Sequence, residues 1–318
     1  MLDSRSFKRK DAMSGSGDST RAILYALSAN FAIAVAKGAA AFFTGSSAML
    51  AETIHSLADC GNQLLLLLGM KQARQPASPE YPLGHGREVY FWSFLVAVML
   101  FTVGGMFSLY EGVHKLRAGE TEPGSSLWWA VAVLVFALIA EGISLRTCLQ
   151  EVDKSRGHRS LWRWFRESRQ AELVVIFGED LAALVGLAFA LLAVLATIIT
   201  GNPVWDAIGT LGIGALLIVV AVLVAIEIKA MLIGQSVDPD RQRQIRQFLD
   251  GRPEIIRVIS LITMQLGNEA MVSVQAHMRE EKDVPLLVDQ INSIELAMKQ
   301  AFPEVRWSFF EPDVRTGV

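Results

Sequence analysis

Six long apolar stretches occupy the first three quarters of the 318-residue sequence. A helix needs about 20 residues to cross the hydrocarbon core of a bilayer, and each stretch reaches that length. The sequence therefore predicts a polytopic α-helical membrane protein with six transmembrane helices. The stretches cover residues 22–43, 48–70, 89–110, 127–147, 173–200 and 204–226.

Charged residues are scarce and unevenly distributed. They make up 19% of the chain, whereas soluble domains contain about 25%. Residues 1–237 hold 38 of them (16%), and residues 238–318 hold 23 (28%), so the apolar bias belongs to the first part. The formal net charge of −3 argues against nucleic acid as a partner, because nucleic-acid-binding domains are usually basic.

The chain divides into three predicted parts. Residues 1–20 are polar, lack the apolar core of a signal peptide, and are predicted to form a disordered cytoplasmic arm. Residues 21–230 are predicted to form the six-helix transmembrane domain. Residues 238–312 are predicted to form an α+β domain in the order αββαβ, with a turn at Gly267-Asn268. A domain of about 80 residues has a marginal core, so we expect it to pair with a second copy. Its predicted elements are 240–250, 255–265, 270–279, 285–301 and 304–311.

Basic residues indicate how the chain is oriented in the membrane. Lys and Arg concentrate in the loops 71–87 and 148–172, whereas the connections 44–47 and 201–203 contain none. The loop 111–126, with two basic residues, is the exception. Because cytoplasmic loops carry the Lys/Arg excess, both termini and the two basic loops are predicted to be cytoplasmic. The predicted location is the cytoplasmic (inner) membrane, with lipid as a partner.

A polar stripe runs through the second apolar stretch. Its members, Glu52, His55, Asp59, Asn62 and Gln63, are spaced so that they share one face of a helix. An ionisable residue inside a membrane helix costs about 2.5–3.5 kcal/mol on insertion, so such residues are functional candidates. His55 and Asp59, at i and i+4, can present an imidazole nitrogen and a carboxylate oxygen to one metal ion.

The fifth stretch holds a second candidate, the adjacent acids Glu179 and Asp180. Two carboxylates among apolar residues cannot stay ionised and unpaired, so they are protonated, paired or bound to a cation. Adjacent helical residues point about 100° apart, and both acids reach one ion only if the helix is distorted, for example at Gly178. The alternative for Glu179 is a structural hydrogen bond to a neighbouring helix.

This donor set favours a divalent cation as cargo. One imidazole with two or three carboxylates suits zinc or manganese, and the lack of thiolates argues against copper(I). Emptying the site requires neutralisation of the carboxylates, most simply by protons, so metal release is coupled to proton uptake. The sequence has neither an HExxH nor a GxSxG motif. The prediction is thus a secondary active transporter without a cofactor rather than an enzyme, with an intramembrane metal hydrolase as the rival.

Other charged residues have less specific interpretations. Lys37 either lines the same cavity or pairs with a buried acid. Glu141, Arg146 and Glu227 lie near predicted span ends and are interpreted as interfacial or ion-paired. The segment 156–169 has the pattern of an interfacial amphipathic segment that binds anionic headgroups.

Two runs of sequence resemble the cation diffusion facilitator family of divalent-metal transporters. They are residues 37–70, which contain HSLAD, and residues 81–92, which contain PLGHGR. Residues 141–145 (EGISL) and 179–187 (EDLAALVGL) are similar to the branch with Glu-Asp in the fifth helix. The resemblance implies a homodimeric metal/proton antiporter that exports zinc, or else manganese, iron or cobalt, and a metallochaperone-like (ferredoxin-like) tail that dimerises. A metal sensor that keeps the fold without transport is a further alternative.

The resemblance also assigns roles to particular residues. His55 and Asp59 match the transport-site pair of helix two, and Asp180 matches the acid of helix five. Ile176 stands where other members carry a His or Asp, so Glu179 is the favoured fourth ligand, with Gln63 or a water as the fallback.

Metal sites elsewhere are predicted to be weak or absent. In the loop site of some members, only His85 remains here, because Ser78 and Tyr81 occupy the other positions. The tail lacks the histidine cluster of zinc-sensing members.

Overall fold

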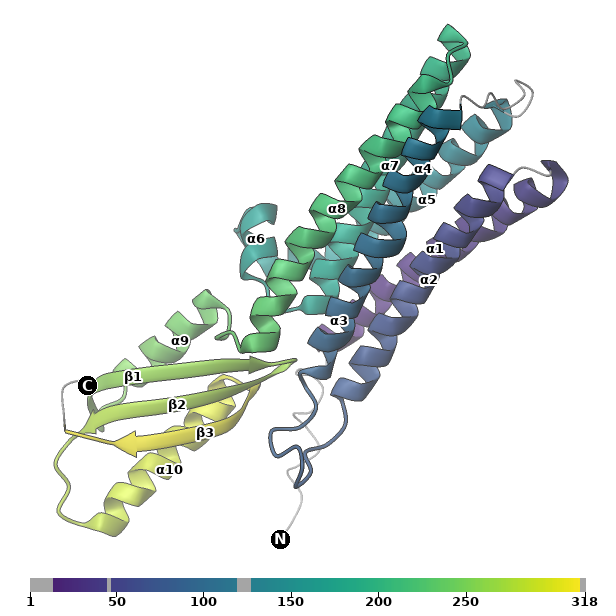
Figure 1. The fold of residues 1–318 in the computed structure, drawn as a ribbon. Helices are drawn as coiled ribbons and strands as arrows, with labels where there is room; N and C mark the ends of the chain where they lie inside the picture. The colour runs from purple at the N-terminus through teal and green to yellow at the C-terminus, as the bar shows by residue number, and fades with distance from the viewer. Residues whose placement is uncertain (1–13, 45–46, 119–126, 315–318) are drawn as a thin grey trace.

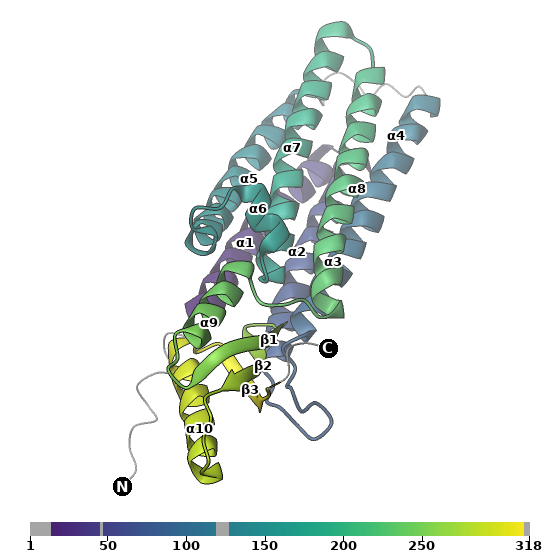
Figure 2. The ribbon, with the colours of Figure 1, turned by 90° about the vertical axis from the view of Figure 1, so that its left-hand side faces the viewer.

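The computed structural model describes residues 14–44, 47–118 and 127–314. Long helices run up and down in an antiparallel bundle, and a small α/β layer lies at one end of it (Figures 1 and 2). The start of α7 and the end of α8 lie at the same end as this layer. The helices of the bundle are α1 (Ser14–Thr44), α2 (Ser47–Ala73), α3 (Glu88–Met99), η1 (Leu100–Met106), α4 (Phe107–Ala118), α5 (Leu127–Arg156), α6 (Leu161–Glu167), α7 (Ala171–Thr200) and α8 (Val204–Ile233).

Five of the predicted apolar stretches each fall within one helix of this bundle, and 89–110 runs through the continuous segment of α3, η1 and α4. Among the described residues, four helical segments are long and apolar enough to cross a membrane, and α1 carries a shorter apolar segment, Ile23–Ala39. The polar stripe lowers the hydropathy of α2. The four segments are Glu88–Arg117, Ala130–Arg156, Ala171–Thr200 and Val204–Ile233, which make the chain a multi-pass membrane protein.

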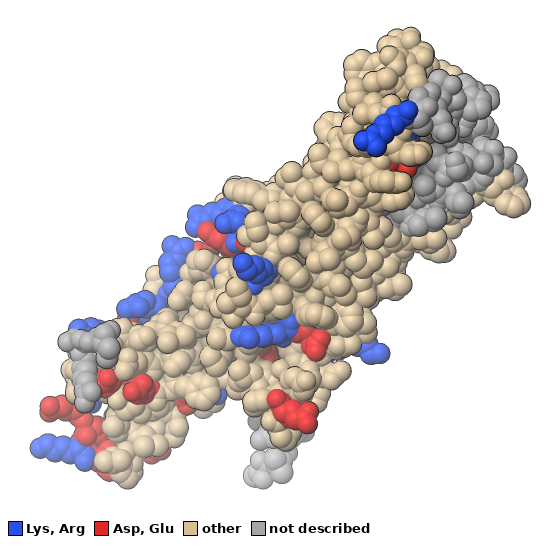
Figure 3. All heavy atoms as spheres, viewed as in Figure 1, with Lys and Arg blue, Asp and Glu red and all other residues tan. Residues whose placement is uncertain are grey.

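The surface of the bundle has the character expected of a lipid-facing protein. Large apolar side chains such as Ile139, Leu192 and Ile199 are more than 60% exposed, which is unfavourable over a wide area in water. Figure 3 shows few charged side chains on the upper bundle and many on the α/β layer and the adjoining end of the bundle.

The predicted arm differs from the structure in part. Helix α1 begins at Ser14, so residues 14–20 are helical. Residues 1–13 lie outside the described part of the chain.

The C-terminal layer has the predicted element order αββαβ. Strands β1 and β2 pair antiparallel and β2 pairs parallel with β3, which gives the sheet order β1-β2-β3. Alternate residues of β2 are buried, and they pack with Ile245 and Leu249 of α9 and Ile294 and Met298 of α10. The elements are α9 (Pro239–Asp250), β1 (Ile255–Leu266), β2 (Glu269–Met278), α10 (Val284–Ala301) and β3 (Val305–Pro312).

The β1–β2 hairpin joins this layer to the bundle. Its turn is at the predicted Gly267-Asn268, where Gly267 adopts a φ of +63° that favours glycine. The Gly267 N–H donates to the hydroxyl of Tyr90 on α3 at 2.9 Å. A Cβ on Gly86 would lie 2.2 Å from the carbonyl oxygen of Leu266. Backbone therefore packs directly on backbone at this contact.

We predict that Gly86→Ala separates the loop before α3 from the β1–β2 turn. The added methyl would overlap a carbonyl oxygen that cannot rotate away, a change that costs about 1–3 kcal/mol. The midpoint of thermal unfolding of the purified protein in detergent should fall by several degrees. Gly212→Ala is the control, because its new Cβ would meet nothing within 4 Å. Equal midpoints for the two variants would contradict the contact.

Candidate functional site

A cluster of polar side chains is buried among α1, α2, α5 and α7. Every member is at most 5% exposed, although three of them are acids. We call this set the polar cluster. It contains Asn30 and Lys37 of α1, Ser56, Asn62 and Gln63 of α2, Glu141 and Ser144 of α5, and Glu179 and Asp180 of α7.

Two amides from α2 hold the carboxylate of Glu179. Asn62 Nδ2 donates to Oε1 at 3.0 Å, and Gln63 Nε2 donates to Oε2 at 3.1 Å. Asn30 Nδ2 donates in turn to Gln63 Oε1 at 3.3 Å. The structural hydrogen bond considered for Glu179 is therefore present. Each carboxylate oxygen keeps a further lone pair with which it could bind a cation.

Asp180 has a different neighbour from Glu179. Its Oδ2 accepts a hydrogen bond from Ser144 Oγ of α5 at 3.0 Å. Helix α7 is regular through these positions, and no distortion occurs at Gly178. The two carboxylates therefore point towards different helices, Glu179 towards α2 and Asp180 towards α5. Gly178 instead admits α8, because a Cβ there would lie 2.8 Å from Val224 Cγ2.

Asp59 lies on α2, facing α7. It is close enough to both Glu179 and Asp180 for their charges to interact. His55 precedes it by about one helical turn on α2, but the His55 side chain lies outside the described part of the structure, as does that of Glu52. The convergence of His55 and Asp59 on one ion therefore stays a prediction.

A cavity of about 10 Å³ opens beside Asp59. It is lined by Ala58, Asp59 and Asn62 of α2 on one side and, at the end of α3 and in η1, by Met99, Leu100, Val103 and Gly104 on the other. Such a volume holds about one water molecule or ion. Asn62 Oδ1 is buried and has no hydrogen-bond donor among the described residues. The wall opposite is a π-helix, a local irregularity that is frequent at functional sites.

Glu141 is a member of the polar cluster that sequence reasoning missed. The interpretation as an interfacial residue is wrong, because Glu141 is buried and its charge interacts with those of Asp180, Asp59 and Lys37. It has no hydrogen bond or ion pair to another described residue. The signal was its spacing of three from Ser144, which places both polar side chains on one face of α5.

The structure also defines the surroundings of Lys37, Gln63 and Ile176. Lys37 Nζ donates to Ser56 Oγ at 3.1 Å and lies near Glu141, so this lysine faces the buried acids. Gln63 has both ends of its amide engaged, which weakens it as the fallback ligand. Ile176 is fully buried in the apolar core.

Two candidates lie outside the polar cluster. His85 packs against Tyr81, with ring centroids 4.3 Å apart and the rings tilted by 39°, in the loop between α2 and α3. Glu227 is ion-paired with Arg166 of α6, as interpreted from the sequence.

The charge balance of the region is its main chemical property. The charges of Asp59, Glu141, Glu179 and Asp180 interact with one another, whereas Lys37, which acts on Glu141, is the one buried lysine or arginine among the described residues. An apolar interior strongly disfavours such an excess of negative charge, and a divalent cation would offset it. Among the side chains that the structure describes, no three His, Cys, Asp or Glu residues are placed to hold a metal. A complete ligand set thus needs a further donor, such as His55.

We predict opposite effects on stability for two alanine variants. Glu179→Ala leaves two buried amides without an acceptor, at a cost of about 2–4 kcal/mol. Glu141→Ala removes a like charge that has no hydrogen bond, so it should leave stability unchanged or raise it. Thermal unfolding midpoints in detergent with a chelator would separate the two. A midpoint for Glu141→Ala as low as that for Glu179→Ala would contradict this description.

Comparison with known proteins gives consistent matches. A model described as the cation efflux transmembrane domain matches residues 23–233. The Xenopus laevis protein named proton-coupled zinc antiporter SLC30A9, mitochondrial, is 30% identical over 268 residues, which is 80% of this chain and 47% of that protein. Metal tolerance protein C4 of Arabidopsis thaliana is 31% identical over 237 residues, 73% of this chain and 50% of that protein. The chain spans about half the length of these two relatives. Cation-efflux pump FieF of Yersinia enterocolitica is 25% identical over 264 residues, 82% of this chain and 81% of that protein.

Proposed function

The chain belongs to the cation efflux family, and on that premise we propose that it exports a divalent metal cation in exchange for protons. The observation that carries the proposal is the excess of interacting carboxylates, from α2, α5 and α7, over buried cations among the described residues. Zinc is the first candidate for the ion, in keeping with the name of the Xenopus relative. Manganese, iron and cobalt are the alternatives, because a carboxylate-rich site is harder than one built from imidazoles.

In this proposal the ion binds at mid-membrane between α2 and α7. His55, Asp59 and Asp180 supply three ligands, and Glu179 supplies the fourth. Asn62 Oδ1 is the alternative fourth donor, because this oxygen is buried without a hydrogen-bond donor among the described residues and lines the cavity beside Asp59.

Proton coupling follows from the same charges. A neutral His55 with ionised Asp59 and Asp180 would cancel the 2+ charge of the ion. When the ion leaves, the carboxylates lose their counter-charge in an apolar interior, and protons are the simplest replacement. Metal release to one side and proton uptake from that side are therefore linked, as antiport by alternating access requires.

The proposal includes a particular arrangement in the membrane. Residues 21–230 form a six-span transport domain, with α1 and α2 as the first two spans, in the cell (inner) membrane. Residues 238–312 form a cytoplasmic domain, and both termini are cytoplasmic. Basic residues support this orientation, because they concentrate at the end of the bundle that carries the α/β layer.

A homodimer completes the proposal. Ile262, Ser273 and Phe309 lie in one row across the three strands, on the face of the sheet opposite α9 and α10. Ile262 and Phe309 are more than half exposed. A second copy of the domain would cover this face and enlarge a small core.

The rival is a metal sensor that keeps the fold without transport. It predicts metal binding but no flux, whereas antiport predicts metal uptake into proteoliposomes that depends on an opposing pH gradient. Uptake that is indifferent to the gradient would argue against proton coupling.

Asp59→Ala and Asp180→Ala are expected to abolish metal-dependent proton flux. Each removes a proposed ligand, and a lost ligand lowers metal affinity well beyond the 10- to 100-fold typical of changes to residues that hydrogen-bond the ligands. The measurement is the internal pH of proteoliposomes after addition of zinc. Asp206→Asn is the control, because Asp206 pairs with Lys115 at the start of α8, away from the polar cluster. Full flux by both alanine variants would refute the assignment.

Glu179→Gln tests the fourth ligand. If Glu179 binds the ion, the apparent KM for zinc rises about tenfold or more, because the amide is a neutral and weaker donor. An unchanged KM would indicate that Glu179 has a structural role and would favour Asn62 as the fourth ligand. Uptake of zinc, manganese, cobalt, iron and cadmium, measured side by side on the original protein and on this variant, would identify the ion as well.

A further inference from the structure

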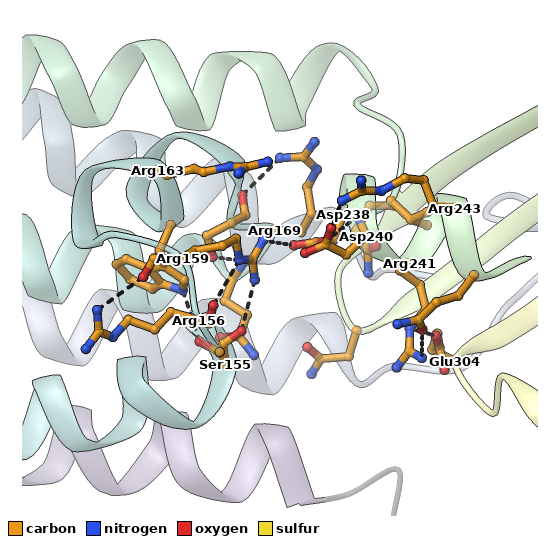
Figure 4. Close-up of a pocket in the computed structure, with 18 of the residues that line it drawn as sticks. Ser155, Arg156, Arg159, Arg163, Arg169, Asp238, Asp240, Arg241, Arg243 and Glu304 are labelled. Atoms are coloured by element: carbon orange, nitrogen blue, oxygen red, sulfur yellow. Dashed lines mark hydrogen bonds and ion pairs between the residues drawn. The ribbon is translucent and has the colours of Figure 1, made fainter.

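A groove lies where α6 and the end of α5 meet α9 and the β1–β2 turn (Figure 4). Its volume is about 840 Å³. Its lining is rich in arginine, with six guanidinium groups and three carboxylates. The arginines are Arg156, Arg159, Arg163, Arg169, Arg241 and Arg243, and the acids are Asp238, Asp240 and Glu304.

Most arginines of the groove pair with carboxylates but keep many N–H donors available. Arg159 of the α5–α6 turn pairs with Asp238 at the start of α9, which ties the bundle to the C-terminal layer. Arg163, Arg241 and Arg243 are each at least 44% exposed in their side chains, and each contacts one carboxylate. A guanidinium has five N–H donors in a fork that suits phosphate oxygens, so each of these arginines can bind a further anion.

Arg169 lies on the wall of the groove, where backbone carbonyl oxygens hold its guanidinium group. It donates to the carbonyl oxygens of Ser236 at 2.7 Å and of Glu167 at 2.7 Å. Burial lowers the pKa of this guanidinium, since water is removed from the charged form. A bound anion would restore favourable interactions to this partly desolvated cation.

Helix α6 places the groove at the depth of lipid headgroups. Trp164 and Phe165 pack on Phe177 of α7, with ring centroids 5.7 and 6.3 Å apart, while Trp162 is exposed. Phe177 lies about 9 Å along α7 from its start. The 30 residues of α7 span about 45 Å, longer than a hydrocarbon core of about 30 Å. Exposed tryptophan at such a level is typical of the membrane interface.

We propose that this groove binds a phosphate-bearing anion, with the headgroup of an anionic phospholipid as the source that the position of α6 favours. Phosphate oxygens would be shared by Arg163 of α6 and by Arg241 and Arg243 of α9. The ligand thereby bridges the bundle and the C-terminal layer, and binding stabilises their relative position. Basic pockets at the cytoplasmic ends of membrane helices suit this class of ligand. The inference does not depend on which ion is transported.

The test measures binding of phosphate-bearing ligands to the full-length protein in neutral detergent. The thermal unfolding midpoint is followed as a function of phosphatidylglycerol, phosphatidylcholine or inorganic phosphate concentration, which gives an apparent Kd for each. Phosphatidylglycerol should raise the midpoint, and phosphatidylcholine should have little effect. If inorganic phosphate raises the midpoint and neither lipid does, the site binds phosphate and its ligand is a soluble anion. Equal responses to the two lipids, or no response to any of the three, would overturn the proposal.

Two double variants locate the binding site. Arg163→Gln with Arg243→Gln removes two exposed arginines of the groove, and the apparent Kd should weaken about tenfold or more. Arg246→Gln with Arg306→Gln is the matched control, because both residues are about half exposed, each pairs with one carboxylate, and neither lines the groove. Exposed ion pairs contribute little to stability, so both doubles should fold. Equal weakening in both doubles would indicate non-specific attraction and overturn the site.

Discussion

Carboxylates enclosed by an apolar helix bundle are the constraint on which the rest of this structure depends. Such groups must be neutralised, hydrogen-bonded or balanced by a cation. Here Asn62 and Gln63 donate hydrogen bonds to Glu179, and Ser144 donates one to Asp180. The charge of Lys37 interacts favourably with that of Glu141. These partners come from four helices, so the positions of α1, α2, α5 and α7 are fixed by polar contacts as well as by packing.

Glu179 and Asp180 are adjacent acids that have different hydrogen-bond partners. On a regular helix they diverge, so each is satisfied by a different neighbour, and repulsion between them is reduced. Asp59 interacts with both. One carboxylate of α2 thus lies near two carboxylates of α7, which is a suitable setting for a small, doubly charged ion.

Much of the architecture could be predicted from the sequence, because periodicity and turn residues act locally. The αββαβ order and the turn at Gly267-Asn268 are confirmed. The spacing of Glu141 and Ser144 places both on one face of α5, but the sequence does not show which face of α5 turns towards α7, so the burial of Glu141 became clear only from the structure. The close approach of α8 at Gly178 likewise involves a residue distant in the sequence, Val224. The full ligand set remains a prediction, since the His55 side chain is outside the described part.

The glycine contact between the hairpin and the loop before α3 has a mechanical consequence. Where side chains separate two elements, small tilts are absorbed by changes of rotamer. Gly86 and Gly267 bring main chain directly against main chain, and Tyr90 secures the same point from α3. Because no side chains separate the two backbones here, the contact is a rigid connection. A tilt of α3, whose far end continues into the π-helix beside Asp59, is transmitted to the sheet as a rigid displacement.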